Sequence, residues 1–369
     1  MEMVKSGMST GTQNNNIQKL YKLEAVRGLA AFYVVLHHTI EHSTVLYGLP
    51  VGFLLRFGQE AVILFFLLSG FVINYSFRVG RDKTLSTYLF KRGTRIYIPL
   101  IFVFLLGYLG QSYNRGELIN PEFWTLLKNI LMLQDWDKVK PNVLAEPYMG
   151  NTPLWSLSYE WWFYMLYFPI ATKIQSGFRQ AVFVFIFSIV MAVLYVIEPN
   201  FLTRLLTYFG IWWAGVYLSE LYLEGKHNSI KSLALPVAAL GVLAAVLFVP
   251  VMAARNAGEG LLLGAHPLLE FRHVFTSLLF VCGAVLWHKI RWIGFDLLLK
   301  PFLLFAPISY VLYICHQPLM VQATYLDFVD NPFLRWFSYL AIVLVFSYVL
   351  ELKVYPLLRN YLRNRRNPA

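Results

Sequence analysis

The sequence predicts an all-α polytopic membrane protein of about ten transmembrane helices, with both termini in the cytoplasm. Hydrophobic residues make up 58% of the 369 residues, whereas charged residues make up only 14%. The apolar residues fall in runs about twenty long, the length that a helix needs to cross the hydrocarbon core of a bilayer. Aromatic residues reach 17%, which suits interfacial belts and apolar cavities.

Ten apolar runs qualify as spans. The first lacks the small-residue cleavage site of a signal peptide, so we expect it to stay in the membrane. Cys282 and Cys315 both fall within spans, and their spacing suggests neither a redox pair nor a metal site, so no metal is expected. The expected spans are 24–44, 53–77, 95–112, 153–173, 180–197, 202–223, 231–254, 270–288, 302–322 and 334–356.

Lys and Arg collect in every second connection between these spans, the pattern of cytoplasmic loops. The longest outer connection, 113–152, carries no positive excess. We therefore expect a disordered cytoplasmic tail over 1–22, a transmembrane domain over 23–357 and a basic cytoplasmic tail over 358–369. The net charge of +11 then mainly reports topology, which argues against nucleic-acid binding.

The first span contains two ionisable residues, Arg27 and His38, eleven positions apart. On an α-helix this spacing is about three turns, so both side chains share one face roughly 16 Å apart. Such groups are costly within a membrane and usually mark a functional site. Glu41 and His42 would continue the His38 face if the helix extends that far. The alternative is that His38 is a hydrogen-bonded interior histidine.

The second and third spans each hold a short motif with two interpretations. Ser69 and Gly70 either permit close helix packing or form a thin wall beside a cavity. Lys91 and Arg92 fit ordinary basic flanking of a span, but Arg95 lies deeper. Two guanidiniums three residues apart at a helix start form a phosphate clamp, to which the helix N-terminus would add amide donors.

Two further ionisable residues lie in later spans. Glu160 is about two turns, or roughly 10 Å, into span four. His316 falls in the outer half of span nine, so we expect Glu160, His316 and His38 at comparable depth. The alternatives are that Glu160 pairs with an arginine for packing and that His316 caps a helix interrupted by proline.

Taken together, these motifs closely resemble acyltransferase family 3, which includes bacterial O-acetyltransferases of O-antigen and other surface polysaccharides. The Arg-x10-His arrangement comes first, followed by the Phe-Phe-x-x-Ser-Gly-Phe block and the Arg-x-x-Arg pair. Trp-Ser-Leu-x-x-Glu-x-x-Phe-Tyr and a late Tyr-x-x-His-x-Pro follow in order. The resemblance covers about residues 20–357.

The resemblance implies an O-acyltransferase of the plasma membrane, here a bacterial inner membrane. It would move an acyl group, commonly acetyl, from coenzyme A on the cytoplasmic side to a hydroxyl of an extracytoplasmic or lipid-linked glycan. His38 matches the family's essential histidine and Arg27 its arginine partner. Arg92 and Arg95 match the pair associated with the donor, and Glu160 matches the acidic residue after the Trp-Ser motif.

The expected mechanism has His38 as general base on the acceptor hydroxyl or, alternatively, as carrier of the acyl group. A membrane transporter or exporter is the competing class, because buried charges also suit a conduction path, and a structural or assembly factor is the third. The predicted site has a catalytic set and a set that binds acetyl-CoA or another acyl-CoA. The catalytic set is His38, Glu160 and His316. The set that binds the acyl donor is Arg27, Arg92, Arg95, Lys91 and Ser69.

Overall fold

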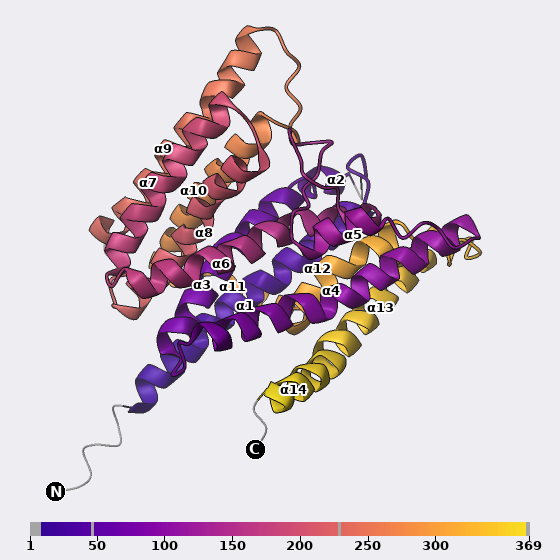
Figure 1. Ribbon diagram of the computed structural model, residues 1–369, viewed down its shortest axis with the longest axis horizontal. Coiled ribbons are helices and arrows are strands. Elements are labelled where there is room, and N and C mark those ends of the chain that lie inside the picture. The colour runs from indigo at the N-terminus through magenta and orange to yellow at the C-terminus, as the bar shows by residue number, and fades with distance from the viewer. Residues whose placement is uncertain (1–8, 46–47, 228–229, 367–369) are drawn as a thin grey trace, which may run out of the picture.

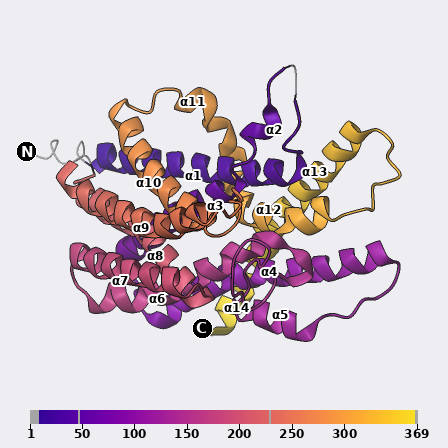
Figure 2. The ribbon, with the colours of Figure 1, turned by 90° about the horizontal axis from the view of Figure 1, so that it is seen from above.

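The computed structural model describes residues 9–45, 48–227 and 230–366, and their regular secondary structure is helical (Figures 1 and 2). In both views α7, α9 and α10 gather on the left, whereas α4, α12 and α13 lie on the right. The long helices are α1 (Ser9–Thr39), α3 (Gly58–Val79), α4 (Leu85–Arg115), α6 (Trp155–Lys173), α7 (Gly177–Ile197), α8 (Phe201–Leu223), α9 (Ile230–Asn256), α10 (Leu268–Lys289) and α13 (Pro332–Val349).

Shorter elements connect or extend these helices. A parallel backbone bridge between Gln134 and Ala145 lies in the connection from α4 to α6. The short helices are α2 (Val51–Leu54), α5 (Phe123–Ile130), α11 (Phe295–Leu298), α12 (Ser309–His316) and α14 (Tyr355–Arg366); the 3-10 turns are η1 (Tyr148–Gly150), η2 (Thr152–Leu154), η3 (Lys300–Leu304) and η4 (Ala306–Ile308); and the π-helical turns are η5 (Gln317–Val321) and η6 (Leu350–Val354).

Six helical segments of the described chain are long and apolar enough to cross a membrane, in keeping with a multi-pass membrane protein. The predicted spans 24–44, 153–173, 202–223 and 302–322 are helical over most of their length but are absent from this set. One of these helices, α8, is buried along most of its length, and its buried residues include polar and aromatic side chains. The six segments are Val51–Val79, Leu85–Arg115, Gly177–Ile197, Lys231–Asn256, Leu268–Lys289 and Pro332–Arg366.

Both ends of the first helix differ from the prediction. Helix α1 ends at Thr39, so Glu41 and His42 lie in the following turn and do not continue its face. The same helix begins at Ser9, so much of the tail expected to be disordered over 1–22 is helical, and residues 1–8 lie outside the described residues.

The predicted span 302–322 is not one helix. Pro307 and Pro318 lie within it, Pro301 lies directly before it, and the segment consists of η3, η4, α12 and η5. Proline lacks a backbone N–H and clashes with the preceding turn, so each one interrupts the regular hydrogen-bond ladder. The last predicted span, by contrast, runs on through η6 into α14 and ends at Arg366.

One end of the bundle, which we call the basic end, contains the start of α4 and the end of α14. Arg366 at the end of α14 donates to Ser86 Oγ at 2.7 Å, so these segments touch. In Figure 1 the start of α1 also lies toward the bottom, with α14, whereas α2 and α5 lie higher and to the right. Both described chain ends therefore lie on the same side of the bundle, and the assignment of that side to the cytoplasm stays a prediction.

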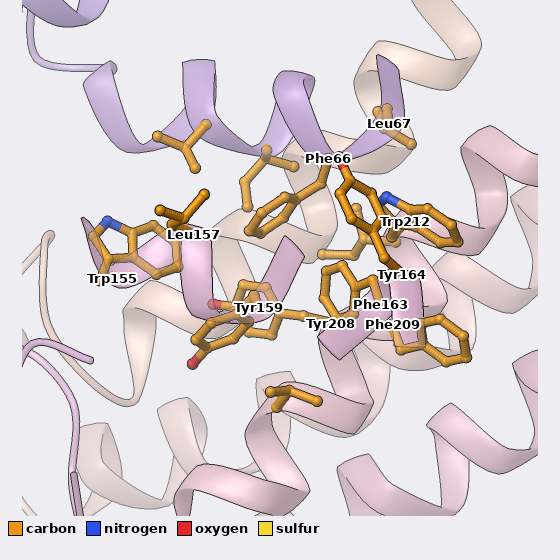
Figure 3. Packing of buried hydrophobic residues seen from close by; sticks show 14 of the residues in the cluster. Phe66, Leu67, Trp155, Leu157, Tyr159, Phe163, Tyr164, Tyr208, Phe209 and Trp212 are labelled. Carbon is orange, nitrogen blue, oxygen red and sulfur yellow. The ribbon is translucent and has the colours of Figure 1, made fainter. Parts of the chain in front are cut away.

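The core lies where α3 and α8 cross without intervening side chains. A Cβ on Gly70 would lie 2.1 Å from Trp212 O, and one on Gly215 would lie 2.0 Å from Leu67 O. Aromatic rings from α6 and α8 fill the adjoining space, as Figure 3 shows. Phe66 packs there on Phe163 with ring centroids 5.4 Å apart. The packing role considered for the Ser69–Gly70 motif therefore falls on Gly70.

Candidate active site

A cavity of about 300 Å³ lies among α1, α3, α4, α6 and α12. Exposed Lys91 lines it, so the cavity reaches the surface at the basic end of the bundle. These five helices, together with Tyr355 of α14, contribute side chains to its wall. Six predicted site residues line this one space, namely Arg27, Ser69, Lys91, Arg92, Arg95 and Glu160.

Arg27 reaches the cavity from α1. Its Nη2 lies 2.5 Å from Glu24 Oε2 and donates to Ala306 O at 3.0 Å. The Nε of Arg27 is buried and has no hydrogen-bond partner among the described residues. Because a buried donor without a partner is costly, this N–H is a natural contact for a ligand oxygen.

Arg92 projects into the cavity from α4. Its Nη2 donates to Ser76 Oγ at 3.2 Å, and its guanidinium carbon lies 5.8 Å from the ring centre of Tyr164. Its Nε is also buried without a partner in the part of the chain that the structure describes. The guanidinium thus packs on an aromatic ring, and its Nε–H remains able to donate a hydrogen bond to a ligand.

Arg95 lies one turn further along α4 and forms an ion pair with Glu351 of η6. The prediction that a helix start would add amide donors here is wrong. Helix α4 begins at Leu85, where Thr84 caps it by accepting from Thr87 N, so both arginines lie two or more turns inside the helix. The charged donors at this end of the cavity are therefore the guanidiniums and the Lys91 ammonium, not the amides of a helix N-terminus.

Glu160 faces the cavity from α6 and is held by two hydroxyls. Ser69 Oγ donates to Glu160 Oε1 at 2.6 Å, and the Tyr164 hydroxyl donates to the same oxygen. Trp212 Nε1 in turn donates to Ser69 Oγ at 3.2 Å. Ser69 therefore lines the cavity, as one of the two interpretations of its motif predicted. The hydrogen-bond partners of Glu160 are the Ser69 and Tyr164 hydroxyls, not His38.

His38 and His316 form a pair at the other end of α1. His316 Nε2 lies 3.2 Å from His38 Nδ1. Neither imidazole is among the residues that line the cavity, but Tyr313 is, and its ring centre lies 6.2 Å from that of His316. The two histidines predicted at comparable depth are thus in contact, one aromatic layer away from the cavity.

Backbone carbonyls determine which nitrogens of this pair carry protons. His38 Nδ1 lies 3.0 Å from Val34 O, and His316 Nδ1 lies 3.2 Å from Leu312 O. A carbonyl only accepts, so both Nδ1 atoms carry hydrogen in the neutral rings. In this tautomer Val34 O and His316 Nε2 share the one His38 Nδ1–H as acceptors, and His38 Nε2 keeps a lone pair, as a general base requires.

A buried ion cluster on the connection from α4 to α6 was not anticipated from the sequence. Asp135 Oδ1 lies 2.7 Å from Lys140 Nζ, and Asp135 Oδ2 lies 2.7 Å from Arg204 Nη2 of α8. The Tyr159 hydroxyl of α6 donates to Asp135 Oδ2 at 2.6 Å. Burial lowers the pKa of Lys140 to about 8, and the Asp135 charge opposes that fall, so Lys140 stays largely protonated at neutral pH. The cluster fastens this connection to α6 and α8.

We expect Asp135→Asn to destabilise the protein by about 3–5 kcal/mol, because Arg204 and Lys140 would remain buried without a counter-charge. Thermal unfolding in detergent would measure the change. Asp330→Asn, which removes an exposed carboxylate, is the matched control and should unfold like the wild type. Equal unfolding of all three proteins would contradict a structural role for the cluster.

The sequence that forms this site matches a known protein family. The family model described as "Acyltransferase domain", that of acyltransferase family 3, matches residues 20–352. The chain belongs to acyltransferase family 3. The resemblance predicted from the five motifs is therefore confirmed. The histidine pair and the lining residues of the cavity, apart from Tyr355, lie within the matched acyltransferase domain.

A relative of this acyltransferase is acyltransferase MdmB of Streptomyces mycarofaciens. The two sequences are 32% identical over 160 residues, which cover 42% of this chain and 39% of MdmB. The matched segment therefore spans about two fifths of the length of the relative. No solved structure matches the chain.

Proposed function

We propose that this acyltransferase moves an acyl group, most simply acetyl, from acyl-CoA to a hydroxyl of an extracytoplasmic or lipid-linked glycan at the bacterial plasma membrane. The observation that carries the proposal is the layout of the cavity. Three guanidiniums from α1 and α4 stand at its surface-connected end, and a histidine pair lies beyond the other end. That layout suits a long donor with a polyanionic head and a reactive thioester at its tip.

In this mechanism the phosphates of the donor contact Arg92, with Arg27 and Arg95 beside it. The thioester reaches toward His38, whose Nε2 takes the proton of the acceptor hydroxyl. The hydroxyl oxygen then bonds to the thioester carbonyl carbon and the carbon–sulfur bond breaks, so that CoA leaves as the thiol after protonation. His316 Nε2 accepts from His38 Nδ1–H and thereby favours the imidazolium that forms.

Binding of free coenzyme A separates this proposal from the transporter alternative. A ligand that binds only the folded protein stabilises it, by about 2.7 kcal/mol at a concentration one hundred times its Kd. We therefore expect coenzyme A to raise the Tm of the purified protein in detergent in a concentration-dependent manner. An unchanged Tm at millimolar coenzyme A, together with a shift caused by a transported solute, would contradict the acyltransferase proposal.

A further inference from the structure

Helix α6 presents a polar stripe to the cavity that separates its charged end from the histidine pair. Tyr164, Glu160 and Ser156 line the cavity at intervals of four residues, about 6 Å apart along the helix. The Tyr164 ring centre lies 5.8 Å from the Arg92 guanidinium carbon, and Ser156 Oγ lies 2.8 Å from the Tyr313 hydroxyl. A molecule that extends from the arginines toward His316 therefore passes Glu160.

The charge changes sign along this path. Arg27, Arg92 and Arg95 stand at the surface-connected end, whereas Glu160 stands one turn of α6 beyond Tyr164. A carboxylate repels phosphate at this range and attracts neutral hydrogen-bond donors. The cavity thus favours a ligand whose anionic part stays at the arginines and whose neutral part lies against Glu160.

The Glu160 carboxylate is held in place but retains accepting capacity. Both hydrogen bonds that the described residues donate to it, from Ser69 and Tyr164, go to Oε1. Trp212 Nε1 donates to Ser69 Oγ at 3.2 Å and so fixes the serine hydroxyl as well. A carboxylate offers about four lone-pair sites, so Oε2 remains for a donor on the ligand.

We propose that Glu160, positioned by Ser69 and Tyr164, accepts a hydrogen bond from an amide N–H on the neutral arm of the acyl donor. The inference rests on the proposed function, because it takes coenzyme A as the donor. The neutral arm is then the pantetheine arm, whose two amides would lie against Glu160. Glu160 then contributes to donor recognition, whereas its predicted depth in the membrane suggested a role beside His38. Donors without an amide arm, such as acyl phosphates, would lack this contact.

Two ligands test the proposal, coenzyme A and adenosine 3′,5′-bisphosphate, which has phosphates but no arm. Isothermal titration of each into wild type, Glu160→Ala and the control Glu198→Ala would give the Kd values. Glu198 is an exposed carboxylate at the end of α7. We expect Glu160→Ala to weaken coenzyme A binding about tenfold or more, because a hydrogen bond to a charged group is lost. Binding of the bisphosphate should stay unchanged, which also shows that the variant is folded.

Other outcomes overturn the proposal in distinguishable ways. Equal weakening of both ligands would mean that Glu160 acts through the arginines. Unchanged binding of both ligands with loss of turnover would place Glu160 in the chemical step. If wild type bound neither ligand, the proposed function would fail together with the inference. Ser69→Ala serves as the second variant and should weaken coenzyme A binding by a smaller factor, because the carboxylate stays but loses one of its two fixed donors.

Discussion

His38→Ala should lower the rate of acyl transfer by about a hundredfold to ten-thousandfold, the usual contribution of a positioned general base. The variant keeps the cavity and its arginines, so coenzyme A binding should be unchanged. The measurement is the initial rate of label transfer from acetyl-CoA into the glycan and glycolipid fraction of membranes that contain equal amounts of each protein.

His42→Ala is the control for this experiment, because His42 is exposed in the turn after α1 and contacts His37, not His38. It should transfer label at nearly the wild-type rate. Retention of more than a tenth of the wild-type rate by His38→Ala would show that another group removes the proton.

Arg92→Gln should raise the Kd for coenzyme A by about tenfold to a hundredfold, because charge-assisted hydrogen bonds to phosphate are lost. Arg92 is the guanidinium of the cavity for which the structure gives no carboxylate partner among the described residues, whereas Arg27 pairs with Glu24 and Arg95 with Glu351. The Kd of Arg92→Lys for coenzyme A should lie between those of the wild type and Arg92→Gln, since an ammonium keeps the charge but not the bidentate geometry. Isothermal titration would measure all three values.

Arg179→Gln provides the comparison for Arg92→Gln, because Arg179 is an exposed arginine at the start of α7. Its Kd for coenzyme A should match that of the wild type. If Arg92→Gln also matched the wild type, the donor phosphates would have to bind elsewhere, and the orientation proposed for the donor would be wrong.

The polar residues inside apolar runs allowed much of the site to be predicted from the sequence. Arg27, Ser69 and Glu160 were each selected because they interrupt such runs, and all three line the same cavity. Their mutual contacts were not predictable, because spacing along one helix does not say which neighbouring helix it meets. Glu160 was therefore paired with His38 by depth alone, whereas the fold pairs it with Ser69.

The missed residues illustrate the same limit. Arg204 and Glu351 both lie within predicted spans, so the rule that singled out His38 also applies to them. Asp135 was different, because a carboxylate in a long connection is usually exposed, and only the packing of that connection on α6 and α8 buries it. The prolines at 301, 307 and 318 were likewise visible signals that span nine is broken.

The most direct test compares, by mass spectrometry, the surface glycans and glycolipids of cells that express the wild-type chain with those of cells that express His38→Ala. Our account predicts an acyl mass increment on a glycan hydroxyl in the wild-type cells alone, and the size of that increment identifies the acyl group. Identical glycan and glycolipid masses in the two cell lines would contradict the claim that this chain is a glycan O-acyltransferase that depends on His38.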